Sequence, residues 1–238
     1  MHKFFFPIAV LIVASLATCA TASVVDFTET FAAGDSNWRG ADASGSDILD
    51  FFPSGGPDGS SFVSFETNFL SFPDGSGPGG GQPTPVLFRG QQNFGSSGGA
   101  FEGNWIEDNV TEFSFSFRHN IPQPVTVFSR FAPASNFPGA LGIDFAPVLP
   151  NQWTEVSISI DENSAQFISF ENSDFESVFS NIANLQLGVV VPEGFGGTPI
   201  NFRFDIDNVQ VTTAVPEPGT GLALMIVGSV CAARRRSR

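Results

Sequence analysis

Alternation between apolar and polar positions runs through the middle of the chain and predicts β-strands. Residues 112–118 alternate strictly, which places three Phe on one face of a strand and Ser side chains on the other. The same period of two appears over residues 155–161, 166–170 and 185–189. No longer window between residues 24 and 213 shows the apolar stripe of an amphipathic helix. The pattern therefore predicts an all-β fold.

The last predicted strand changes its alternation partway along. Every second residue from Ile200 to Ile206 is apolar, whereas Val209 and Val211 have the opposite parity. Both sets are buried together only if one extra residue is inserted between them, so we expect a β-bulge near Asp207-Asn208. Bulges often orient side chains at functional sites, which makes Asp205 and Asp207 candidate functional residues.

Clusters of Gly, Pro, Ser and Asn separate the predicted strands. The longest cluster, residues 73–85, is compatible with either a domain linker or a loop. Residues 23–72 are too few and too rich in turn residues to bury a core alone. We therefore expect one domain over residues 23–213, with residues 73–85 as a long mobile loop. Short strands joined by turns are typical of an antiparallel β-sandwich of jelly-roll type.

Charge is distributed unevenly along the chain. The formal net charge is −14, with 24 acidic residues against 10 basic ones. All 24 acids lie within residues 23–218, where the basic residues are five Arg, so this interior carries a net charge of −19. Such acidity argues against nucleic acid as a partner, because phosphate backbones are bound by Lys and Arg. The interior also lacks Cys, which excludes a disulfide or a thiol nucleophile there.

The first 22 residues have the features of a secretory signal peptide. A short polar and basic start precedes an apolar run over residues 4–16, and Ala20-Thr21-Ala22 fits a small-x-small cleavage site. We expect a signal helix at residues 1–22 and a mature start near Ser23. Two alternatives remain open. Residues 16–19 are similar to the lipobox of bacterial lipoproteins, in which Cys19 would be lipidated, and the run is also compatible with a buried N-terminal element.

The C-terminus has three parts in a fixed order. Val215, Pro216, Glu217 and Pro218 precede an apolar stretch over residues 219–233, which is followed by Arg234, Arg235, Arg236 and Arg238. A helix of about 15 residues spans about 22 Å, which makes the predicted transmembrane helix a marginal anchor. The Arg cluster should stay in the cytoplasm, so the preceding domain lies on the far side of the membrane.

This three-part tail, residues 214–238, resembles the PEP-CTERM sorting signal of Gram-negative bacteria. The resemblance implies that an exosortase-like membrane transpeptidase recognises and cleaves the region Val215 to Pro218. Gly219 stands where the family often has Ser. Proteins with this signal are exported across the inner membrane, anchored transiently, and then reach the cell surface or extracellular matrix, where they accompany exopolysaccharide and biofilm production. A simple single-span tail anchor is the alternative.

Three segments of the body resemble carbohydrate-binding jelly rolls: residues 27–38, 151–156 and 204–209. In that group an acid in the opening segment and an Asp in the final strand often share a structural Ca²⁺. The resemblance points to Glu29 and Asp207 as calcium ligands, and carboxylate oxygens suit this ion. The alternative is that these carboxylates are simply solvated beside the bulge.

Sugar binding would use exposed aromatic rings. We expect Trp38 and Trp105, in loop-like segments, to be ligand-binding residues that contact extracellular polysaccharide, and we expect Trp153 to be part of the core.

Catalysis has little support in the sequence. Residues 95–99 match G-x-S-x-G without the strand-turn-helix context of a nucleophile elbow, and His119, expected at the surface, is the only interior His. The sequence thus favours a non-enzymatic secreted sandwich, with a carbohydrate-binding module as the alternative and a glycan-active hydrolase last.

Overall fold

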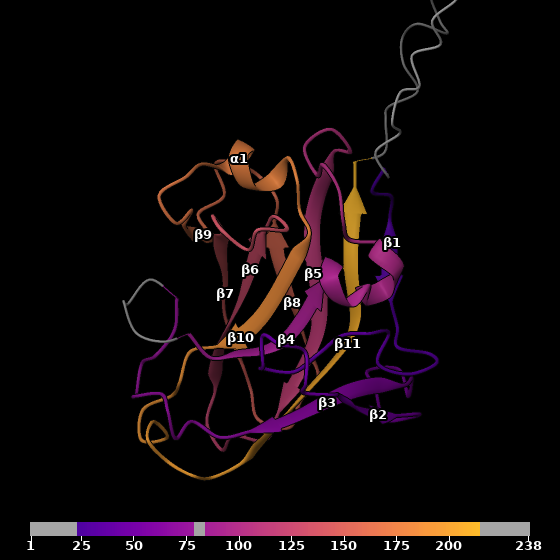
Figure 1. Cartoon of the computed structure of the whole chain (residues 1–238). Helices are drawn as coiled ribbons and strands as arrows, with labels where there is room; N and C mark the ends of the chain where they lie inside the picture. Colours follow the sequence, from indigo (N-terminus) through magenta and orange to yellow (C-terminus); the bar gives the residue numbers. More distant parts are fainter. Residues whose placement is uncertain (1–22, 79–83, 215–238) are drawn as a thin grey trace, which may run out of the picture.

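Two antiparallel sheets pack face to face and form a β-sandwich of jelly-roll type (Figure 1). The computed structural model describes residues 23–78 and 84–214. The all-β prediction is confirmed, because helix in these residues is limited to α1 (Phe175–Phe179) and two 3-10 turns, η1 (Gln92–Phe94) and η2 (Ser96–Gly99). The predicted signal helix, Cys19 and the predicted transmembrane helix lie outside the described residues.

The first sheet has the strand order β2-β3-β11-β5-β8, and β1 also pairs with β11. Its strands are β1 (Phe27–Glu29), β2 (Asp50–Phe52), β3 (Phe62–Thr67), β5 (Val110–His119), β8 (Thr154–Ser159) and β11 (Phe202–Thr213). Strand β11 pairs with β5 along one edge, and with β3 and then β1 along the other. Strands from both sides of residues 73–85 therefore share this sheet.

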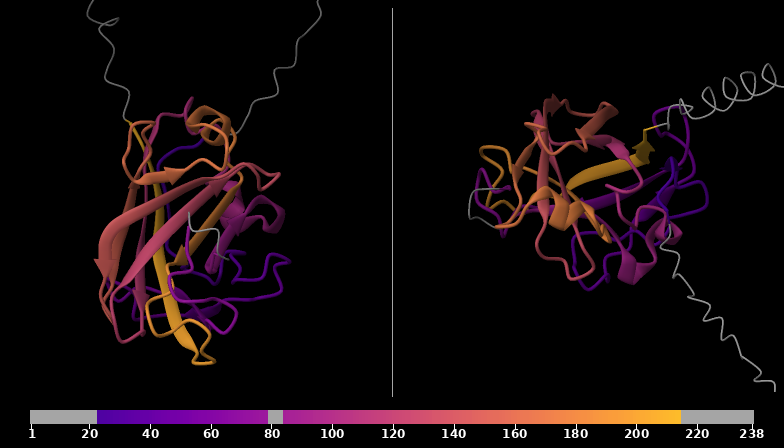
Figure 2. Two further views of the ribbon diagram at one scale, coloured as in Figure 1. Left: turned by 90° about the vertical axis from the view of Figure 1, so that its left-hand side faces the viewer. Right: turned by 90° about the horizontal axis from the view of Figure 1, so that it is seen from above.

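The second sheet has the strand order β4-β10-β6-β7-β9. Its strands are β4 (Val86–Gln91), β6 (Val125–Ala132), β7 (Ala140–Val148), β9 (Phe167–Ser169) and β10 (Asn184–Val189). All neighbours in it are antiparallel. The views in Figure 2 show this sheet as a layer beside the first one. Each sheet therefore has an inner face in the core and an outer face.

Phe side chains fill much of the space between the sheets. Phe113, Phe115 and Phe117 of β5 are at most 1% exposed, as the alternation predicted. The ring of Phe113 lies edge to face with that of Phe131 from the second sheet, with centroids 5.3 Å apart. Burial of one such side chain contributes about 2–3 kcal/mol, and edge-to-face contacts add to this. The core therefore depends on aromatic packing between the layers.

The predicted β-bulge is present in β11. Asp207 pairs with Ser116 of β5, whereas Gln210 pairs with Ser114, so one extra residue is inserted between them. Asn208 at the bulge has a φ of 49°, a value that Asn tolerates better than most residues. Residues on both sides of the bulge then reach the core. The prediction was wrong only for Ile200, which precedes β11 and is half exposed.

Residues 73–78, the first part of the predicted mobile loop, are hydrogen-bonded to the chain that follows β10. The Gly75 amide donates to the Val191 carbonyl at 2.9 Å, and the Val191 amide donates to the Ser76 carbonyl at 2.8 Å. Asp74 Oδ1 accepts from the Gly196 amide at 2.6 Å. Residues 79–83 lie outside the described residues. The loop is therefore fixed at its start.

The two ends of the described chain lie together at one end of the sandwich. Ser23 Oγ donates to Asp108 Oδ1 at 2.8 Å, and the Ala214 amide donates to the neighbouring Asn109 carbonyl at 2.8 Å. The segments that carry the two predicted sorting signals therefore start from the same end. Within residues 23–78 and 84–214, no helix is long and apolar enough to cross a membrane.

Candidate functional site

A groove of ≈ 320 Å³ opens on the outer face of the second sheet. We call it the amide groove, because carboxamide side chains dominate its lining: Ala43, Arg89, Gln91, Gln92, Asn93, Ala134, Asn136 and Asn184. No aromatic and no acidic side chain is among these lining residues. Ligands would therefore be held there by hydrogen bonds rather than by stacking on rings.

Strand register explains why these polar side chains meet. The leucines of β10 are buried in the core, so Asn184 and Gln186 between and beside them point to the outer face. Asn184 pairs with Gln91 of β4, and Gln186 pairs with Arg89. Directly opposite residues of antiparallel strands lie on the same face. The outer face of β4 and β10 consequently carries one pair of carboxamides, Asn184 and Gln91, beside one carboxamide paired with a guanidinium, Gln186 and Arg89.

Hydrogen bonds within the protein fix one wall of the amide groove. Asn136 Oδ1 accepts from Gln186 Nε2 at 2.8 Å and from Arg130 Nη1 at 3.1 Å. Arg130 in turn donates from Nε and Nη2 to the two carboxylate oxygens of Glu171 at 2.6 and 2.7 Å. A bidentate Arg–carboxylate pair holds a fixed geometry. Asn136 is therefore held in place before any ligand binds.

Other groups in the groove keep their hydrogen-bonding capacity free. The Gln91 carboxamide makes no hydrogen bond with any described residue, although the residue is only 7% exposed. Arg89 donates from Nε to the Ala41 carbonyl at 3.0 Å, and its two terminal nitrogens have no partner in the described part of the chain. These side-chain atoms are not sealed from solvent, so water takes their hydrogen bonds until a ligand displaces it. A ligand with hydroxyl groups would satisfy them.

The Arg89 guanidinium sits in an unfavourable environment for charge. Burial lowers the pKa of Arg89, and the neighbouring positive charge of Arg130 lowers it further, while Asp42 and Asp47 act in the opposite direction. Arg nevertheless stays protonated, because its ordinary pKa is above about 12. Arg89 is thus a partly desolvated cation whose free N–H groups are directed to the groove that it lines.

Glu29 and Asp207, which we call the carboxylate pair, meet where β1 and β3 both contact β11. Glu29 at the end of β1 pairs with Val209, just beyond the bulge that contains Asp207. Asp207 is fully buried and accepts from Ser60 Oγ at 2.7 Å and from the Asn208 amide at 2.7 Å. Glu29 Oε1 accepts from the Phe31 amide at 2.8 Å. The bulge therefore brings the two predicted calcium ligands into one neighbourhood.

The charge of the carboxylate pair is not balanced by Arg. Burial raises the pKa of Asp207; hydrogen bonds from Ser60 and Asn208 oppose this, and the negative charges of Asp58 and Glu29 raise it again. The four ion pairs in the described residues involve other acids. No group of three His, Cys, Asp or Glu side chains positioned for one ion occurs in the described ranges. A cation here would need hydroxyl or carbonyl oxygens as further ligands, and it fits the unbalanced charge.

The two Trp predicted to bind ligand are both part of the core, which corrects that expectation. Trp38 is fully buried and lies against Gly90, where a Cβ would come within 2.7 Å of the ring. Its Nε1 donates to Ser97 Oγ at 2.9 Å. Trp105 is also fully buried, and its Nε1 donates to the Phe101 carbonyl at 2.9 Å. Neither ring has a face available to a sugar.

The remaining predictions on single residues are also corrected. Trp153, expected in the core, is partly exposed on the outer face of the first sheet. His119, expected at the surface, is 1% exposed, and its Nε2 lies 3.1 Å from the Val148 carbonyl oxygen. Burial lowers the pKa of His119, which favours the neutral ring. Ser97 of the G-x-S-x-G match bonds Trp38 rather than His119, so these two residues do not form a nucleophile and base.

The fold and the groove together define a jelly-roll sandwich with a polar groove on the outer face of its second sheet. Beyond the described domain, residues 214–237 match the family model of the PEP-CTERM protein-sorting motif, which confirms the predicted resemblance. This motif marks bacterial proteins for export and sorting to the cell surface. Residues 215–218 and the Arg cluster, to which sequence analysis gave roles in processing, lie outside the described residues, and Arg238 follows the matched segment.

Comparison with solved structures finds carbohydrate-binding proteins. The sandwich is similar to the family 11 carbohydrate-binding module of a cellulosomal cellulase from Clostridium thermocellum, with 11% identity, a TM-score of 0.45, and coverage of 83% of this chain and 100% of that one. An endo-1,4-β-D-xylanase of Clostridium thermocellum with CBM22-1 and GH10 modules gives 11% identity, a TM-score of 0.46 and coverage of 83% of this chain. The chain spans 29% of that xylanase's length. An exo-β-agarase gives 11% identity and a TM-score of 0.46, with coverage of 82% of this chain and 26% of that one. No curated protein matched the sequence.

Proposed function

We propose that this protein is exported, processed at Val215 to Pro218 by an exosortase-like transpeptidase, and binds extracellular polysaccharide in the amide groove. The sorting motif at residues 214–237 supports the routing. The observation that carries the binding is the set of unpaired polar groups in the groove, above all the Gln91 carboxamide and the Arg89 terminal nitrogens. The task of the protein is then adhesion to polymer outside the cell rather than turnover.

The groove matches the chemistry of a sugar chain. Each hydroxyl group is both a donor and an acceptor, and each Gln or Asn carboxamide offers both functions in turn. One hydrogen bond of this kind contributes about 0.5–1.5 kcal/mol, so several are needed for useful affinity. The groove supplies five carboxamides, from Gln91, Gln92, Asn93, Asn136 and Asn184, beside one Arg. The amide nitrogens of Gln92 and Asn184 already donate to Glu102 Oε2 and to the Pro133 carbonyl, so Gln91 and Asn93 offer the most capacity. The absence of aromatic side chains among the lining residues favours a soluble chain over a flat crystalline surface.

We predict that Gln91→Ala weakens polysaccharide binding about tenfold, because one or two hydrogen bonds to the sugar are lost. A panel of immobilised glycans identifies a ligand for the exported protein, and titration calorimetry with that ligand gives the affinity of the variant. Gln152→Ala is the matched control, because Gln152 is exposed and lies outside the groove. Equal affinity of the Gln91 and Gln152 variants, or no binding to any glycan, would reject the groove as the binding site.

We further propose that the carboxylate pair holds a structural Ca²⁺. Glu29 and Asp207 would supply carboxylate oxygens, and the ion would neutralise two buried negative charges that no Arg balances. The nearby segment between Gly56 and Ser60 offers hydroxyl and carbonyl oxygens, since Ser60 Oγ already lies 2.7 Å from Asp207 Oδ2. The role is one of stability, because binding to the folded state alone favours folding.

Calcium at 100 times its Kd should raise the melting temperature of the exported protein at pH 7 by about 5–10 °C over a chelator control. The effect should weaken as the pH falls and Asp207 becomes protonated. Burial raises the pKa of Asp207, so without calcium this group favours the fold below the ordinary aspartate pKa of about 3.9, and its contribution is lost as pH rises through the higher folded-state pKa. Calcium offsets this loss only where Asp207 is charged.

The Asp207→Asn variant separates the effect of calcium on stability from the effect of the buried carboxylate itself. The variant keeps an acceptor for the Asn208 amide and removes the buried charge, so it should melt at or above the wild-type temperature without calcium and gain nothing from calcium. Glu162→Gln, a change at an exposed acid, should keep the full calcium effect. An unchanged wild-type melting temperature between calcium and chelator at pH 7 would eliminate the calcium site.

A further inference from the structure

A second polar pocket, of ≈ 380 Å³, lies at the first sheet, on the other side of the sandwich from the amide groove. Its lining residues are Arg118, His119, Asn120, Asn151, Arg203 and Asp205. We call it the arginine pocket. Asp205 is the only acid among the lining residues, and this balance is unusual in a chain whose interior is strongly acidic.

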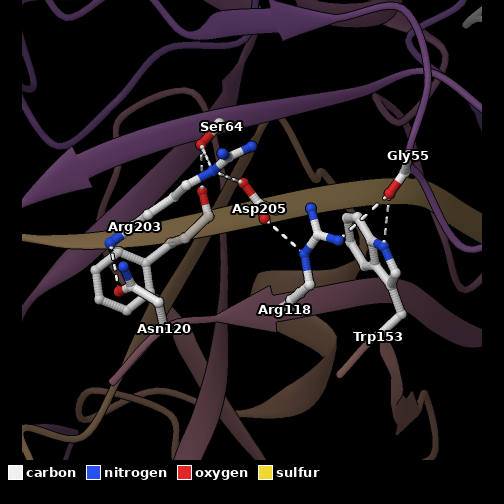
Figure 3. Close-up of polar contacts among 8 residues, drawn as sticks. Gly55, Ser64, Arg118, Asn120, Trp153, Arg203 and Asp205 are labelled. Carbon is white, nitrogen blue, oxygen red and sulfur yellow. Dashed lines mark hydrogen bonds and ion pairs between the residues drawn. The ribbon is translucent and has the colours of Figure 1, made fainter. Parts of the chain in front are cut away.

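The two Arg of this pocket share one carboxylate. Arg118 of β5 pairs with Asp205 of β11, and Arg203 lies two residues before Asp205 on the same face of β11. Arg118 Nε donates to Asp205 Oδ2 at 2.8 Å, and Arg203 Nε donates to Asp205 Oδ1 at 2.7 Å (Figure 3). Asp205 is 3% exposed. Among the lining residues, two guanidinium groups therefore share one carboxylate, while Glu66 of β3 lies opposite Arg203 outside the lining.

Aromatic rings hold both guanidinium groups in position. The Arg118 guanidinium carbon lies 4.4 Å from the Trp153 ring centroid and 5.0 Å from that of Phe62. The Arg203 guanidinium carbon lies 4.3 Å from the Phe52 centroid. Trp153 is itself fixed, because its Nε1 donates to the Gly55 carbonyl at 3.0 Å (Figure 3). Such stacking reduces the entropy that the side chains lose when a ligand binds.

Several donors remain for a ligand. Both Arg use Nε for Asp205; Arg118 Nη1 makes one long bond, 3.4 Å, to the Gly55 carbonyl, and the terminal nitrogens of Arg203 have no partner in the described residues. Asn120 Oδ1 accepts from the Arg203 amide at 2.9 Å, which leaves the Asn120 amide nitrogen as a further donor. The side chains of Arg118 and Arg203 are 25% and 31% exposed.

We propose that the arginine pocket binds the carboxylate or sulfate groups of an acidic polysaccharide. The terminal nitrogens of a guanidinium match a two-oxygen anion, and charge-assisted hydrogen bonds are stronger than neutral ones. By contrast, Arg39 and Arg130 each have an acid of their own, so neither has a positive charge to spare. This site lies on a different sheet from the amide groove, and its ligand is selected by charge rather than by hydroxyl groups.

The competing explanation is that the two Arg have only a structural role. Their contacts with the Gly55 carbonyl and the Phe52 ring would then only hold the segment around Gly55 against the sheet. Both explanations predict lower stability when either Arg is replaced, so melting temperature does not separate them. Ligand charge does. If the two Arg have only a structural role, the protein should have the same affinity for an acidic oligosaccharide and for its neutral ester. If they form a binding site, the affinity for the acidic form should be higher.

The test uses the exported protein and titration calorimetry with oligogalacturonate and its fully methyl-esterified form. Wild type should bind the acid at least about tenfold more tightly than the ester, and binding should weaken with added salt, because exposed charges are screened. Arg118→Gln and Arg203→Gln should each lose about tenfold or more in affinity for the acid, which is the loss of one charge-assisted contact. Arg39→Gln, with the same change in charge, should bind as wild type does.

Inorganic sulfate at matched ionic strength distinguishes the source of the anion. Weaker binding of free sulfate than of the oligomer supports a polysaccharide ligand, whereas equal binding at equal anion concentration overturns it. The proposal also fails if wild type binds acid and ester alike, or if Arg39→Gln loses as much affinity as Arg118→Gln. Circular dichroism of each variant at the titration temperature confirms that loss of binding is measured on folded protein.

Discussion

Replacing Trp105 with Ala should lower the free energy of unfolding by about 3–5 kcal/mol, the loss typical of a fully buried Trp. The indole is fully buried, with ring centroids 5.5 Å from Phe131 and 5.9 Å from Phe179. Its Nε1 also satisfies the buried Phe101 carbonyl at 2.9 Å. Removal would therefore leave a cavity between both sheets and α1, together with an unpaired acceptor.

Trp153→Ala is the matched comparison for this prediction. Trp153 is partly exposed, and its main contacts are the Arg118 guanidinium, the Phe62 ring at 5.5 Å between centroids, and one hydrogen bond to the Gly55 carbonyl. Loss of these contacts should cost about 1–2 kcal/mol. Urea unfolding followed by far-UV circular dichroism gives both values. A larger loss for Trp153 than for Trp105 would mean that the packing of the two rings has been assigned the wrong way round.

Replacing Pro216, Glu217 and Pro218 together with Ala should abolish C-terminal processing, an all-or-none effect. The sorting motif covers these residues and ends in the Arg cluster, so the processing enzyme is expected to recognise the Pro-Glu-Pro sequence directly. Pro also disfavours a helix interior, which Ala does not. The intact mass of the protein recovered from membrane and extracellular fractions shows whether the Arg cluster is still attached.

Gly219→Ser is the control for this variant, because it introduces the residue that PEP-CTERM signals often have at this position. It should be processed as wild type is. Recovery of the triple variant outside the cell with a shortened C-terminus would contradict recognition of Pro-Glu-Pro. Recovery of wild-type protein that retains Arg234 to Arg238 would contradict processing altogether, and would favour a simple tail anchor.

The strands could be predicted because burial in a sandwich has a period of two that needs no knowledge of partners. Phe113, Phe115 and Phe117 face the core as their spacing requires. The bulge was predictable for the same reason, since the parity change between Ile206 and Val209 permits only an inserted residue. These features are local, and the sequence alone therefore contains them.

The Trp residues were misplaced because their surroundings are set by distant parts of the chain. Trp38 is buried because Gly90, from another strand, leaves room for its ring. Trp105 is buried because α1 and β6 cover it. A loop-like sequence around a Trp predicts an irregular backbone, but it does not predict whether the indole ring points into the core or to solvent. Gly90 within the strand-like sequence of residues 86–91 was the one signal of a close approach.

The amide groove was missed because its residues come from separate parts of the sequence. Gln91, Asn136 and Asn184 are polar residues without a motif. The pairing of β4 with β10 brings Gln91 and Asn184 together, and the loop between β6 and β7 adds Asn136. The arginine pocket has the same origin, since Arg118 and Arg203 meet through the pairing of β5 with β11. By contrast, the carboxylate pair followed from family resemblance, and the bulge explains why Glu29 and Asp207 lie in one neighbourhood.

The central claim is that polysaccharide binds in the amide groove, and side-chain amide NMR tests it most directly. The exported protein, labelled with ¹⁵N, is titrated with the glycan selected on the panel. We predict that the carboxamide signals of Gln91, Asn136, Asn184 and Gln186 shift together and saturate at one affinity, while the indole signal of Trp105, which is buried in the core, stays in place. Saturable binding with shifts confined to other residues, and none at these four, would contradict it.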